Sequence, residues 1–414
     1  MVQYIAGNII FILLIYATAL ERILPFFGYW DELITILLPA VLIYKARERR
    51  DLVPFLEKLA PHLIPIVVFL IIGLMGNLFH FGYQSSFVAI IKDILAVAKF
   101  PIVVYFLRYG LKYIPMKKGF RQIGKTARIL VLITSVAALI GYFIDLGLYT
   151  GEIRILNCFK FIFPHPTYLV SSYVFLLGVL FADSIEKNKP YIFLDCLILF
   201  MGQRTKGYVV ILLALGFLFI KKDWITEFFL NENGRIKLSK KQIAIITAVI
   251  GGLLFLIAGG KVMDTVKYGM TAARPALYIV GFKLLMECFP FGAGFGTFGS
   301  YLSGEYYSGV YHEYGISGIW GLTPDTYNYM ADTYWPYIYG QFGIFGCILY
   351  IRILWDILFY QFRRIKDYNK MTAFILVWAY VLFTTTAEAY FTGGTGIQMA
   401  VFMTVYFGME KQKE

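Results

Sequence analysis

Long runs of apolar residues, separated by short polar segments, dominate the chain. Twelve of these runs approach the ~20 residues that an α-helix needs to cross the hydrocarbon core of a membrane. The pattern predicts an all-α, polytopic membrane protein with about twelve transmembrane helices, and residues 1–414 form one membrane domain in this prediction. The predicted helices lie at about residues 4–20, 32–46, 61–79, 87–107, 127–149, 167–184, 190–203, 206–220, 241–259, 335–354, 372–388 and 395–409.

The composition narrows the class of protein further. Hydrophobic residues make up 59% of the chain and charged residues only 15%, whereas soluble domains carry about 25% charged residues. So few charges do not cover a soluble surface of this size, which argues against a cytosolic enzyme, a nucleic-acid-binding protein and a disordered chain. The four cysteines have no CxxC or metal-ligand spacing, and no HExxH or Walker motif is present. We therefore expect no metal and no cofactor.

The basic residues are unevenly divided between alternate loops. Of the 38 Lys and Arg residues, 27 lie in one set of loops and nine in the other, while Lys92 and Lys99 lie within the fourth predicted helix. The positive-inside rule places the richer set in the cytoplasm. Both termini are then cytoplasmic, and the number of spans is even. The net charge of +12 reflects this orientation, so we expect no nucleic-acid partner.

The longest loop, residues 261–334, is extracytoplasmic in this orientation. It contains four basic, six acidic and sixteen aromatic residues, and long irregular loops are usually functional. Tyrosine-rich surfaces suit the binding of sugar rings, although an interfacial aromatic belt has the same composition. A single large outer loop without an internal repeat suits an enzyme better than an alternating-access carrier.

The short seventh and eighth predicted helices meet at a tight turn that contains Arg204 and Lys206. Charged groups near membrane depth are costly and are therefore candidates for a functional site. Arg204 is a candidate catalytic residue, or else an interfacial arginine that extends to water. Lys206 is a candidate contact for an anion, or else an interfacial anchor.

Arg274 opens a second candidate segment. With Pro275 in the first turn, the following residues predict a short helix of about 13 residues that lies along the outer surface. This helix ends at residues 290–296, a glycine-rich turn. Such a turn stops a helix, and a phosphate-binding loop is the less common alternative.

Asp332 lies directly before the tenth predicted helix, followed by Thr333 and Tyr334 as candidate substrate-binding residues. An aspartate at this place either caps the helix or acts as a general base for a sugar hydroxyl. His312, next to Glu313 in the same loop, is a rival acid or base. His165 lies on the same predicted side of the membrane as a further binding candidate.

Lys92 and Lys99 are seven residues apart and therefore share one face of the fourth predicted helix. Lys99 lies deep enough to need an anionic partner or a wet cavity. In the structural interpretation, Lys92 pairs with Asp145, or Lys99 pairs with a carboxylate. The alternative is that these lysines bind a lipid phosphate.

Together, these elements resemble the O-antigen polymerase and O-antigen ligase superfamily, which includes capsular repeat-unit polymerases. The resemblance rests on the Arg204 turn, on Arg274 before a helix that ends at residues 289–298, and on residues 332–334 before a helix that continues to residues 343–346. It covers the topology of the whole chain, with the matching residues at about 201–346. It implies a GT-C-like membrane protein of the bacterial cytoplasmic membrane.

The enzymes of this superfamily are metal-independent glycosyltransferases that act at the outer membrane face on sugars linked to undecaprenyl diphosphate. By this resemblance Arg204 and Arg274 would bind the diphosphate, because the planar guanidinium donates paired hydrogen bonds and stays charged. Asp332 or His312 would take the proton from the attacking hydroxyl. The ligases of the superfamily carry a histidine where this chain has Asp332, which favours a polymerase.

The resemblance also implies partners. The expected substrate is an undecaprenyl-diphosphate-linked oligosaccharide within the membrane lipid, with a chain-length regulator and a flippase as protein partners. Two alternative functions remain: an O-antigen ligase, and a lipid-linked oligosaccharide flippase or transporter.

Overall fold

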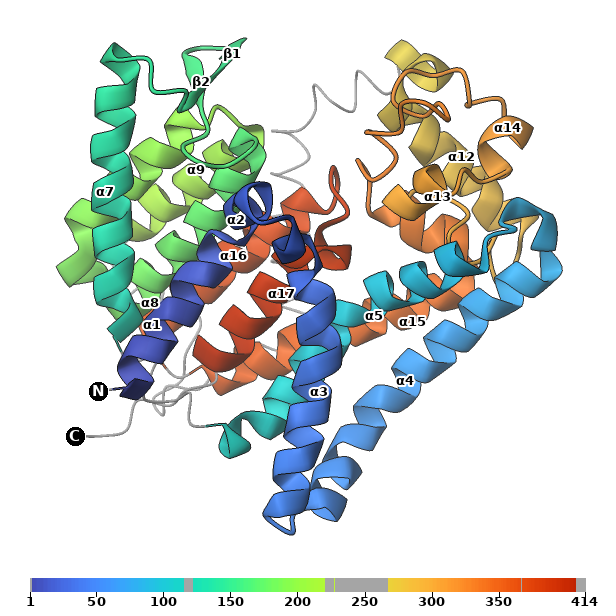
Figure 1. The fold of residues 1–414 in the computed structure, drawn as a ribbon, viewed down its shortest axis with the longest axis horizontal. Coiled ribbons are helices and arrows are strands. Elements are labelled where there is room, and N and C mark those ends of the chain that lie inside the picture. The colour runs from blue at the N-terminus through green and yellow to red at the C-terminus, as the bar shows by residue number, and fades with distance from the viewer. Residues whose placement is uncertain (1, 115–121, 220–226, 228–266, 366, 407–414) are drawn as a thin grey trace.

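Long apolar helices make up most of the structure (Figure 1). The computed structural model describes residues 2–114, 122–219, 227, 267–365 and 367–406. The first half contains α1 (Val2–Ile15), α2 (Ala17–Ile23), η1 (Pro25–Tyr29), α3 (Trp30–Glu48), α4 (Leu52–Phe79), η2 (Phe81–Tyr83), α5 (Phe87–Gly110), η3 (Leu111–Tyr113), α7 (Ile123–Phe143), β1 (Tyr149–Ile153) and β2 (Asn157–Phe159). The second half contains α8 (Pro166–Met201), α9 (Thr205–Phe219), η5 (Gly269–Thr271), α12 (Ala273–Glu287), α13 (Tyr301–Glu305), α14 (Val310–Glu313), α15 (Trp335–Arg364), α16 (Tyr368–Thr384), η6 (Tyr390–Thr392), α17 (Gly394–Val401) and η7 (Phe402–Tyr406).

Five of the described helices are long and apolar enough to cross a membrane. They are Pro25–Glu48, α4, α7, α8 and α15, and a sixth span results if α1 and α2, bent by 76°, are counted as one broken helix. The structure is therefore mostly helical, and its apolar helices are typical of a multi-pass membrane protein. The 24 residues of α5 include four charged side chains, at Lys92, Asp93, Lys99 and Arg108, and this helix is not among the five.

The helix α8 reverses direction in its middle. Ser184 has an extended backbone (φ −173°, ψ 117°) between two helical halves. Beyond the second half, a Cβ on Gly202 would lie 2.9 Å from Val170 Cγ2 of the first half. The two halves are therefore antiparallel neighbours, in agreement with separate predicted helices at 167–184 and 190–203.

Three other predicted spans are shorter helices in the structure, and one predicted span lies outside the described residues. The helices α9, α16 and α17 coincide with the predicted segments 206–220, 372–388 and 395–409 but are shorter than 18 residues. The predicted helix 241–259, Met1 and residues 407–414 lie outside the described residues. The count of twelve spans and the cytoplasmic position of both termini therefore stay predictions.

A small β-hairpin was not anticipated by the all-α prediction. The predicted helix 127–149 ends earlier, at Phe143, and β1 then pairs antiparallel with β2. The backbone N–H of Gly147 donates to Asp145 Oδ1 at 3.0 Å, and Gly147 has a φ of +67°. An Asx turn followed by a left-handed glycine stops the helix and starts the hairpin.

The segment 267–334 has a small hydrophobic core of its own. The buried side chains of α12 pack with residues of the following loop, among them Phe298, Tyr311 and Met330. The helix α12 packs directly against α15, and its position along the membrane surface stays a prediction. A Cβ on Gly281 of α12 would lie 2.9 Å from the ring of Tyr339 and 3.1 Å from Pro336. A glycine therefore permits this close contact between the helices.

The glycine-rich turn after α12 crosses α15 and distorts it. The N–H groups of Ala293 and Gly294 donate to the carbonyl oxygens of Gly340 and Gln341 at 3.0 and 2.8 Å. Gly343 leaves the helical conformation (φ +60°, ψ −165°), and a Cβ there would lie 2.2 Å from the carbonyl oxygen of Pro290. Only glycine fits this crossing, so the turn fixes the loop segment to α15.

Candidate functional site

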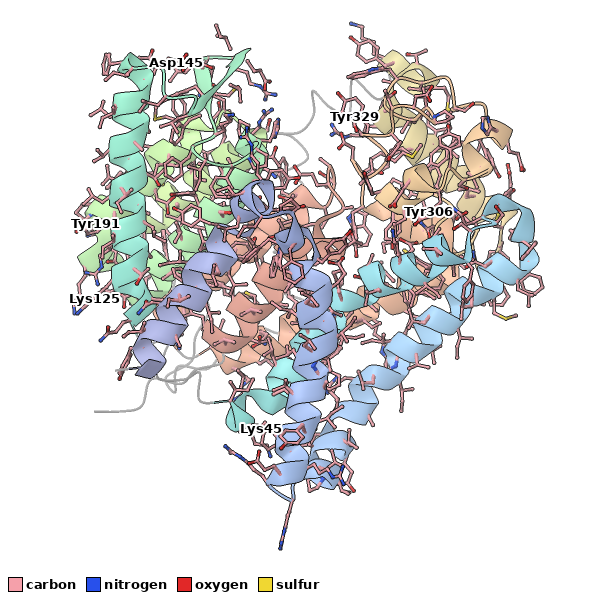
Figure 2. All side chains as sticks on the ribbon, in the orientation of Figure 1. Lys45, Lys125, Asp145, Tyr191, Tyr306 and Tyr329 are labelled. Atoms are coloured by element: carbon pink, nitrogen blue, oxygen red, sulfur yellow. The ribbon has the colours of Figure 1, made fainter. Side chains whose placement is uncertain are left out.

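Most candidate residues lie at one end of the helix bundle. We call this end the hairpin face; it comprises β1, β2, the turn at residues 202–204, α12–α14 and residues 385–393, and it is uppermost in Figure 1. Lys45 and Lys125 lie toward the opposite end, away from Asp145 (Figure 2). The hairpin face therefore collects polar side chains on segments that the sequence separates by more than 200 residues.

Arg204 is held by the β-hairpin and by the start of α8. Its Nη2 donates to Glu152 Oε2 at 2.8 Å and lies 3.0 Å from Nε2 of His165. The side chain is only 13% exposed, and its Nε is buried without a hydrogen-bond partner in the described part of the chain. The interpretation of Arg204 as a residue that extends into water is therefore wrong.

The β-hairpin fixes the turn that carries Arg204. Arg154 donates from Nη1 to the carbonyl oxygen of Gln203 at 3.1 Å and from Nε to Glu152 at 2.8 Å. The hydrogen bond from Arg154, together with the charge of Arg204, lowers the pKa of Glu152. Glu152 is therefore a carboxylate that orients both arginines, and sequence reasoning missed it because the hairpin itself was not predicted.

His165 is a neutral imidazole in this environment. Burial, and then the positive charge of Arg204, lower the pKa of its ring below the usual 6.5. Its Nδ1 lies 3.3 Å from the N–H of Thr167, where it caps α8, and its Nε2 faces Arg204. Nδ1 accepts the hydrogen bond from Thr167, and a neutral ring has only one nitrogen that accepts, so Nε2 is an acceptor only in the tautomer that gives up the cap of α8. His165 thus places one potential proton acceptor beside a cation.

Lys206 forms a buried ion pair that the sequence did not suggest. Its Nζ lies 2.8 Å from both carboxylate oxygens of Glu388, and its side chain is 8% exposed. The interpretation of Lys206 as a simple interfacial anchor is therefore wrong. Glu388 was assigned to the end of the predicted helix 372–388, whereas α16 ends at Thr384. The sequence signal that could have identified Glu388 is a carboxylate at the end of an apolar run.

Arg274 and Asp332 contact each other. Arg274 donates from Nη2 to Asp332 Oδ2 at 3.0 Å and from Nε to the backbone oxygen of Asp332 at 3.2 Å. About a third of each side chain is exposed. Thr333 and Tyr334, the adjacent binding candidates, are fully buried, and Tyr334 donates to the hydroxyl of Tyr350 at 2.6 Å. These two residues therefore belong to the packed interior in this structure.

Residues 385–393, which connect α16 to α17, link the two groups of cations. Glu388 binds Lys206, and the N–H of the next residue, Ala389, donates to the carbonyl oxygen of Ala331 at 3.0 Å. The hydroxyl of Tyr278 in α12 donates to the carbonyl oxygen of Thr386 at 2.8 Å. Arg204 and Arg274 are held by different carboxylates, and this connection lies between them.

Lys99 and Lys92 have different environments. Lys99 lies 2.7 Å from Asp31 and 2.7 Å from Glu32, and its side chain is 3% exposed. This confirms the expected anionic partner, and a role in binding lipid phosphate stays a prediction. Lys92 contacts Glu305 at 3.2 Å and the hydroxyl of Tyr306 at 3.0 Å.

The suggested Lys92–Asp145 pair is wrong. Tyr306, which binds Lys92, and Asp145 lie on opposite sides of the molecule (Figure 2). His312 is exposed on α14, with its ring centroid 5.2 Å from that of Tyr307. Its neighbour Glu313 accepts a hydrogen bond from Tyr83 at 2.9 Å. His312 and Glu313 are therefore directed to different partners.

The backbone N–H groups of the glycine-rich turn are engaged within the protein. Phe295 donates to Asn77 Oδ1 and Gly296 to Asp93 Oδ2, each at 2.8 Å. The N–H groups of residues 292–294 donate to backbone oxygens. A phosphate-binding loop needs such groups to be free, so this turn is a packing element. Asp93, fully buried, is a structural carboxylate that sequence reasoning missed.

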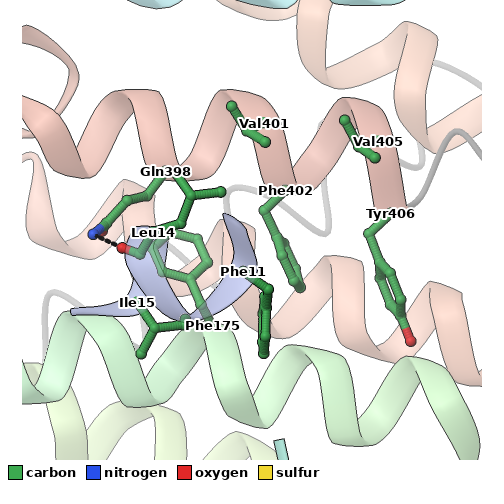
Figure 3. Close-up of a pocket in the computed structure, with 9 residues that line it drawn as sticks. All are labelled: Phe11, Leu14, Ile15, Phe175, Gln398, Val401, Phe402, Val405 and Tyr406. Carbon is green, nitrogen blue, oxygen red and sulfur yellow. Dashed lines mark hydrogen bonds between the residues drawn. The ribbon is translucent and has the colours of Figure 1, made fainter. Parts of the chain in front are cut away.

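A small pocket between α1, α8 and α17 is hydrophobic (Figure 3). It is lined by Phe11, Leu14, Ile15, Phe175, Gln398, Val401, Phe402, Val405 and Tyr406. The amide of Gln398 donates to the carbonyl oxygen of Leu14. None of the candidate catalytic residues lines this pocket, so it is not part of the candidate site.

Among the described residues, no group of three or more His, Cys, Asp or Glu side chains could hold a metal ion. The chemistry available at the hairpin face is that of arginine, lysine, histidine and carboxylate groups. A comparison of the chain with known protein families finds no matching family, and a comparison with curated proteins finds no similar sequence.

Proposed function

We propose that this protein is a membrane polysaccharide polymerase that joins oligosaccharide repeat units carried on undecaprenyl diphosphate. The proposal includes a twelve-span, GT-C-like membrane domain in the bacterial cytoplasmic membrane, with both termini in the cytoplasm and the hairpin face outside. The position of Lys45 and Lys125 toward the other end agrees with the positive-inside rule. The reaction is metal-independent glycosyl transfer that inverts the anomeric centre.

One observation supports this function more than any other. Three cations from two distant segments lie at one face: Arg204 and Lys206 at one turn, and Arg274 in α12. Residues 385–393 bond to Lys206 and, through Ala389, to the backbone of Ala331 beside Asp332, the partner of Arg274. A lipid diphosphate carries several negative charges at the membrane surface, and guanidinium groups bind it through paired, charge-assisted hydrogen bonds. In the structure, Glu152, Glu388 and Asp332 bind these cations and hold them in position.

The geometry also favours one residue as the general base. Asp332 accepts a charge-assisted hydrogen bond from Arg274, so its carboxylate is already engaged with a cation. His165 is neutral and presents Nε2 next to Arg204. When Arg204 turns to the diphosphate, Nε2 becomes available to an acceptor hydroxyl in the tautomer that carries the lone pair on this nitrogen. We therefore propose His165 as the base, and His312 and Asp332 become the less favoured candidates.

In the proposed reaction, one bond forms as another breaks. The hydroxyl oxygen of the acceptor sugar attacks the anomeric carbon of the donor, and the bond from that carbon to the diphosphate oxygen breaks. His165 takes the hydroxyl proton, and the departing diphosphate keeps the electron pair. Arg204 and Arg274 stabilise the charge that develops on the leaving group, which is usually the largest contribution to catalysis.

The test compares Arg204→Ala and Arg274→Ala with Lys283→Ala, an exposed control on the same helix as Arg274. We expect each arginine variant to insert normally and to lower chain formation by about two orders of magnitude, leaving single repeat units, while the control keeps long chains. Long chains that accumulate on the lipid carrier would instead indicate the ligase. A normal chain-length distribution in both arginine variants would refute the site.

A lipid-linked oligosaccharide flippase or transporter is the second candidate, favoured by a separate observation. Charged groups pair between helices, with Lys99 of α5 bound to Asp31 and Glu32 of α3, and Arg108 of α5 bound to Asp356 of α15 at 3.0 Å. Charged residues inside helices that cross a membrane often mark transport pathways. Single repeat units trapped at the inner membrane face in Lys99→Met would support this candidate over the polymerase.

A further inference from the structure

A carboxyl group without a partner lies inside the bundle of α1, α7 and α8. Asp195, in the second half of α8, is 0% exposed, and neither of its carboxylate oxygens has a hydrogen-bond partner among the described residues. No basic side chain of the described part of the chain forms an ion pair with it. An ionised carboxylate is very costly at such a place unless a positive charge accompanies it.

The hydroxyl groups of two tyrosines lie near this carboxyl group without being hydrogen-bonded to it. The hydroxyls of Tyr16 and Tyr173 lie 3.1 Å apart, and Thr134 of α7 is hydrogen-bonded to Tyr173. Asp195 acts electrostatically on both tyrosines and on the thiol of Cys196, the neighbouring residue. These three are the titratable groups that face Asp195 from the elements described. All of them are neutral at physiological pH.

The same place coincides with a break in the first helix. The helices α1 and α2 are bent by 76° at Tyr16, so the backbone oxygens at the end of α1 leave the helical pattern. The carbonyl oxygen of Ile15 accepts instead from Ser172 at 2.8 Å. Broken membrane helices that meet a buried carboxylate commonly form binding sites for small cations, since freed carbonyl and hydroxyl oxygens act as ligands.

From these observations we propose that Asp195, with the hydroxyls of Tyr16, Tyr173 and Thr134, binds a monovalent cation, either Na⁺ or a proton. One carboxylate and three neutral hydroxyls carry a single negative charge, so one monovalent cation makes the site neutral. A divalent ion would leave a net positive charge in an apolar interior, which is costly. This site is separate from the glycosyl-transfer chemistry and does not depend on it.

Thermal unfolding of the full-length protein in detergent tests the proposal. The unfolding midpoint is compared in sodium chloride and choline chloride at equal ionic strength, and at pH 6 and pH 8. A bound cation stabilises the folded protein, so we expect the midpoint of the wild type to be higher by roughly 3 °C either in sodium or at the lower pH. The first result identifies Na⁺, and the second identifies a proton.

Substitutions test whether Asp195 causes the dependence of the unfolding midpoint on the cation. Asp195→Asn should remove the dependence on the cation, whereas Asp183→Asn should keep it, because Asp183 lies in the same helical hairpin with 35% of its side chain exposed. If Asp195→Asn does not fold, Tyr173→Phe keeps the carboxylate and should raise the cation concentration that gives half of the effect. An unchanged dependence in Asp195→Asn, or in Tyr173→Phe as its substitute, overturns the proposal.

Chemical labelling gives an independent measurement. A hydrophobic carbodiimide adds to a protonated carboxyl group within a membrane and forms a stable N-acylurea, which mass spectrometry locates in the sequence. We expect labelling of Asp195 that slows as the pH rises or as sodium is added. Equal labelling from pH 5 to pH 9, unaffected by sodium, would show a permanently protonated acid and would overturn the proposal.

Discussion

Arg274 binds Asp332 twice, through the carboxylate at 3.0 Å and through the backbone carbonyl at 3.2 Å. The pair joins the first turn of α12 to the residue three positions before α15, and it therefore closes the long loop segment between these helices. A substitution that removes only the charge of Asp332 keeps the backbone contact. The variant Asp332→Asn therefore distinguishes two roles of Asp332: positioning Arg274, or accepting the proton as the base.

The first prediction uses this separation. In Asp332→Asn, Arg274 keeps its bond to the backbone oxygen, so we expect chain formation to fall by no more than about tenfold. In His165→Gln the proposed proton acceptor is lost, and we expect a fall of about 100-fold or more. The glycan chain-length profile and the amount of inserted protein are measured for both variants. A larger loss in Asp332→Asn than in His165→Gln would return the role of base to Asp332.

The second prediction concerns pH and His165. Burial and the charge of Arg204 lower the pKa of this imidazole below 6.5 in the folded protein. The unfolded chain then binds the proton first as the pH falls through 6.5, so acidification favours unfolding in this window. His165 should therefore lower the stability of the wild type relative to His165→Gln as the pH falls from 7.5 to 5.5, whatever other groups contribute to the two curves alike. Unfolding midpoints across this range measure the difference, and parallel curves for the two proteins would contradict it.

The third prediction compares the two lysines of α5. Removing the charge in Lys99→Met leaves Asp31 and Glu32 without their cation at a buried place, which should cost about 3–5 kcal/mol. Lys92→Met breaks an exposed contact with Glu305 and should cost less than about 1 kcal/mol. Denaturant unfolding in the same detergent measures both changes. Equal losses would mean that Lys99 is not the buried partner of these carboxylates.

The fourth prediction tests the crossing between the glycine-rich turn and α4. A Cβ on Gly294 (φ +93°) would lie 2.3 Å from the backbone nitrogen of Asn77, so Gly294→Ala combines backbone strain with a steric clash. Gly147 (φ +67°) has open space around it and serves as the matched control. We expect a loss of about 1 kcal/mol for Gly147→Ala and about 1–3 kcal/mol more for Gly294→Ala. Similar losses in both variants would rule out the close approach.

The sequence predicted the helical class, the reversal near Ser184 and the helix start at Trp335, because apolar runs and their polar interruptions directly reflect membrane-spanning helices. It also led to the pairing of Lys99 with a carboxylate, since a buried lysine needs an anion. It did not lead to Glu152 or Glu388. Those contacts depend on a short hairpin and a connecting segment whose positions are set by tertiary packing, which leaves no local periodicity in the sequence.

The role of the glycine-rich turn could not be decided from the sequence either. Its composition fits both a phosphate-binding loop and a packing element, and only the partners of its N–H groups decide between them. Those partners, Asn77, Asp93 and the 340–341 carbonyl groups, lie about 50 to 220 residues away in the chain. A single sequence does not indicate such long-range hydrogen bonds.

Residues 385–393 contact α9 through Glu388, α12 through Thr386 and the segment before α15 through Ala389. A rotation of the α16–α17 pair would therefore displace both Lys206 and the segment that contains Asp332. Binding of an anion at Lys206 would release Glu388, which belongs to this connection, and binding at Arg274 would release Asp332, whose neighbour Ala331 bonds to the connection. Under the proposed function, a substrate bound at one end of the face would thereby affect the cations at the other end.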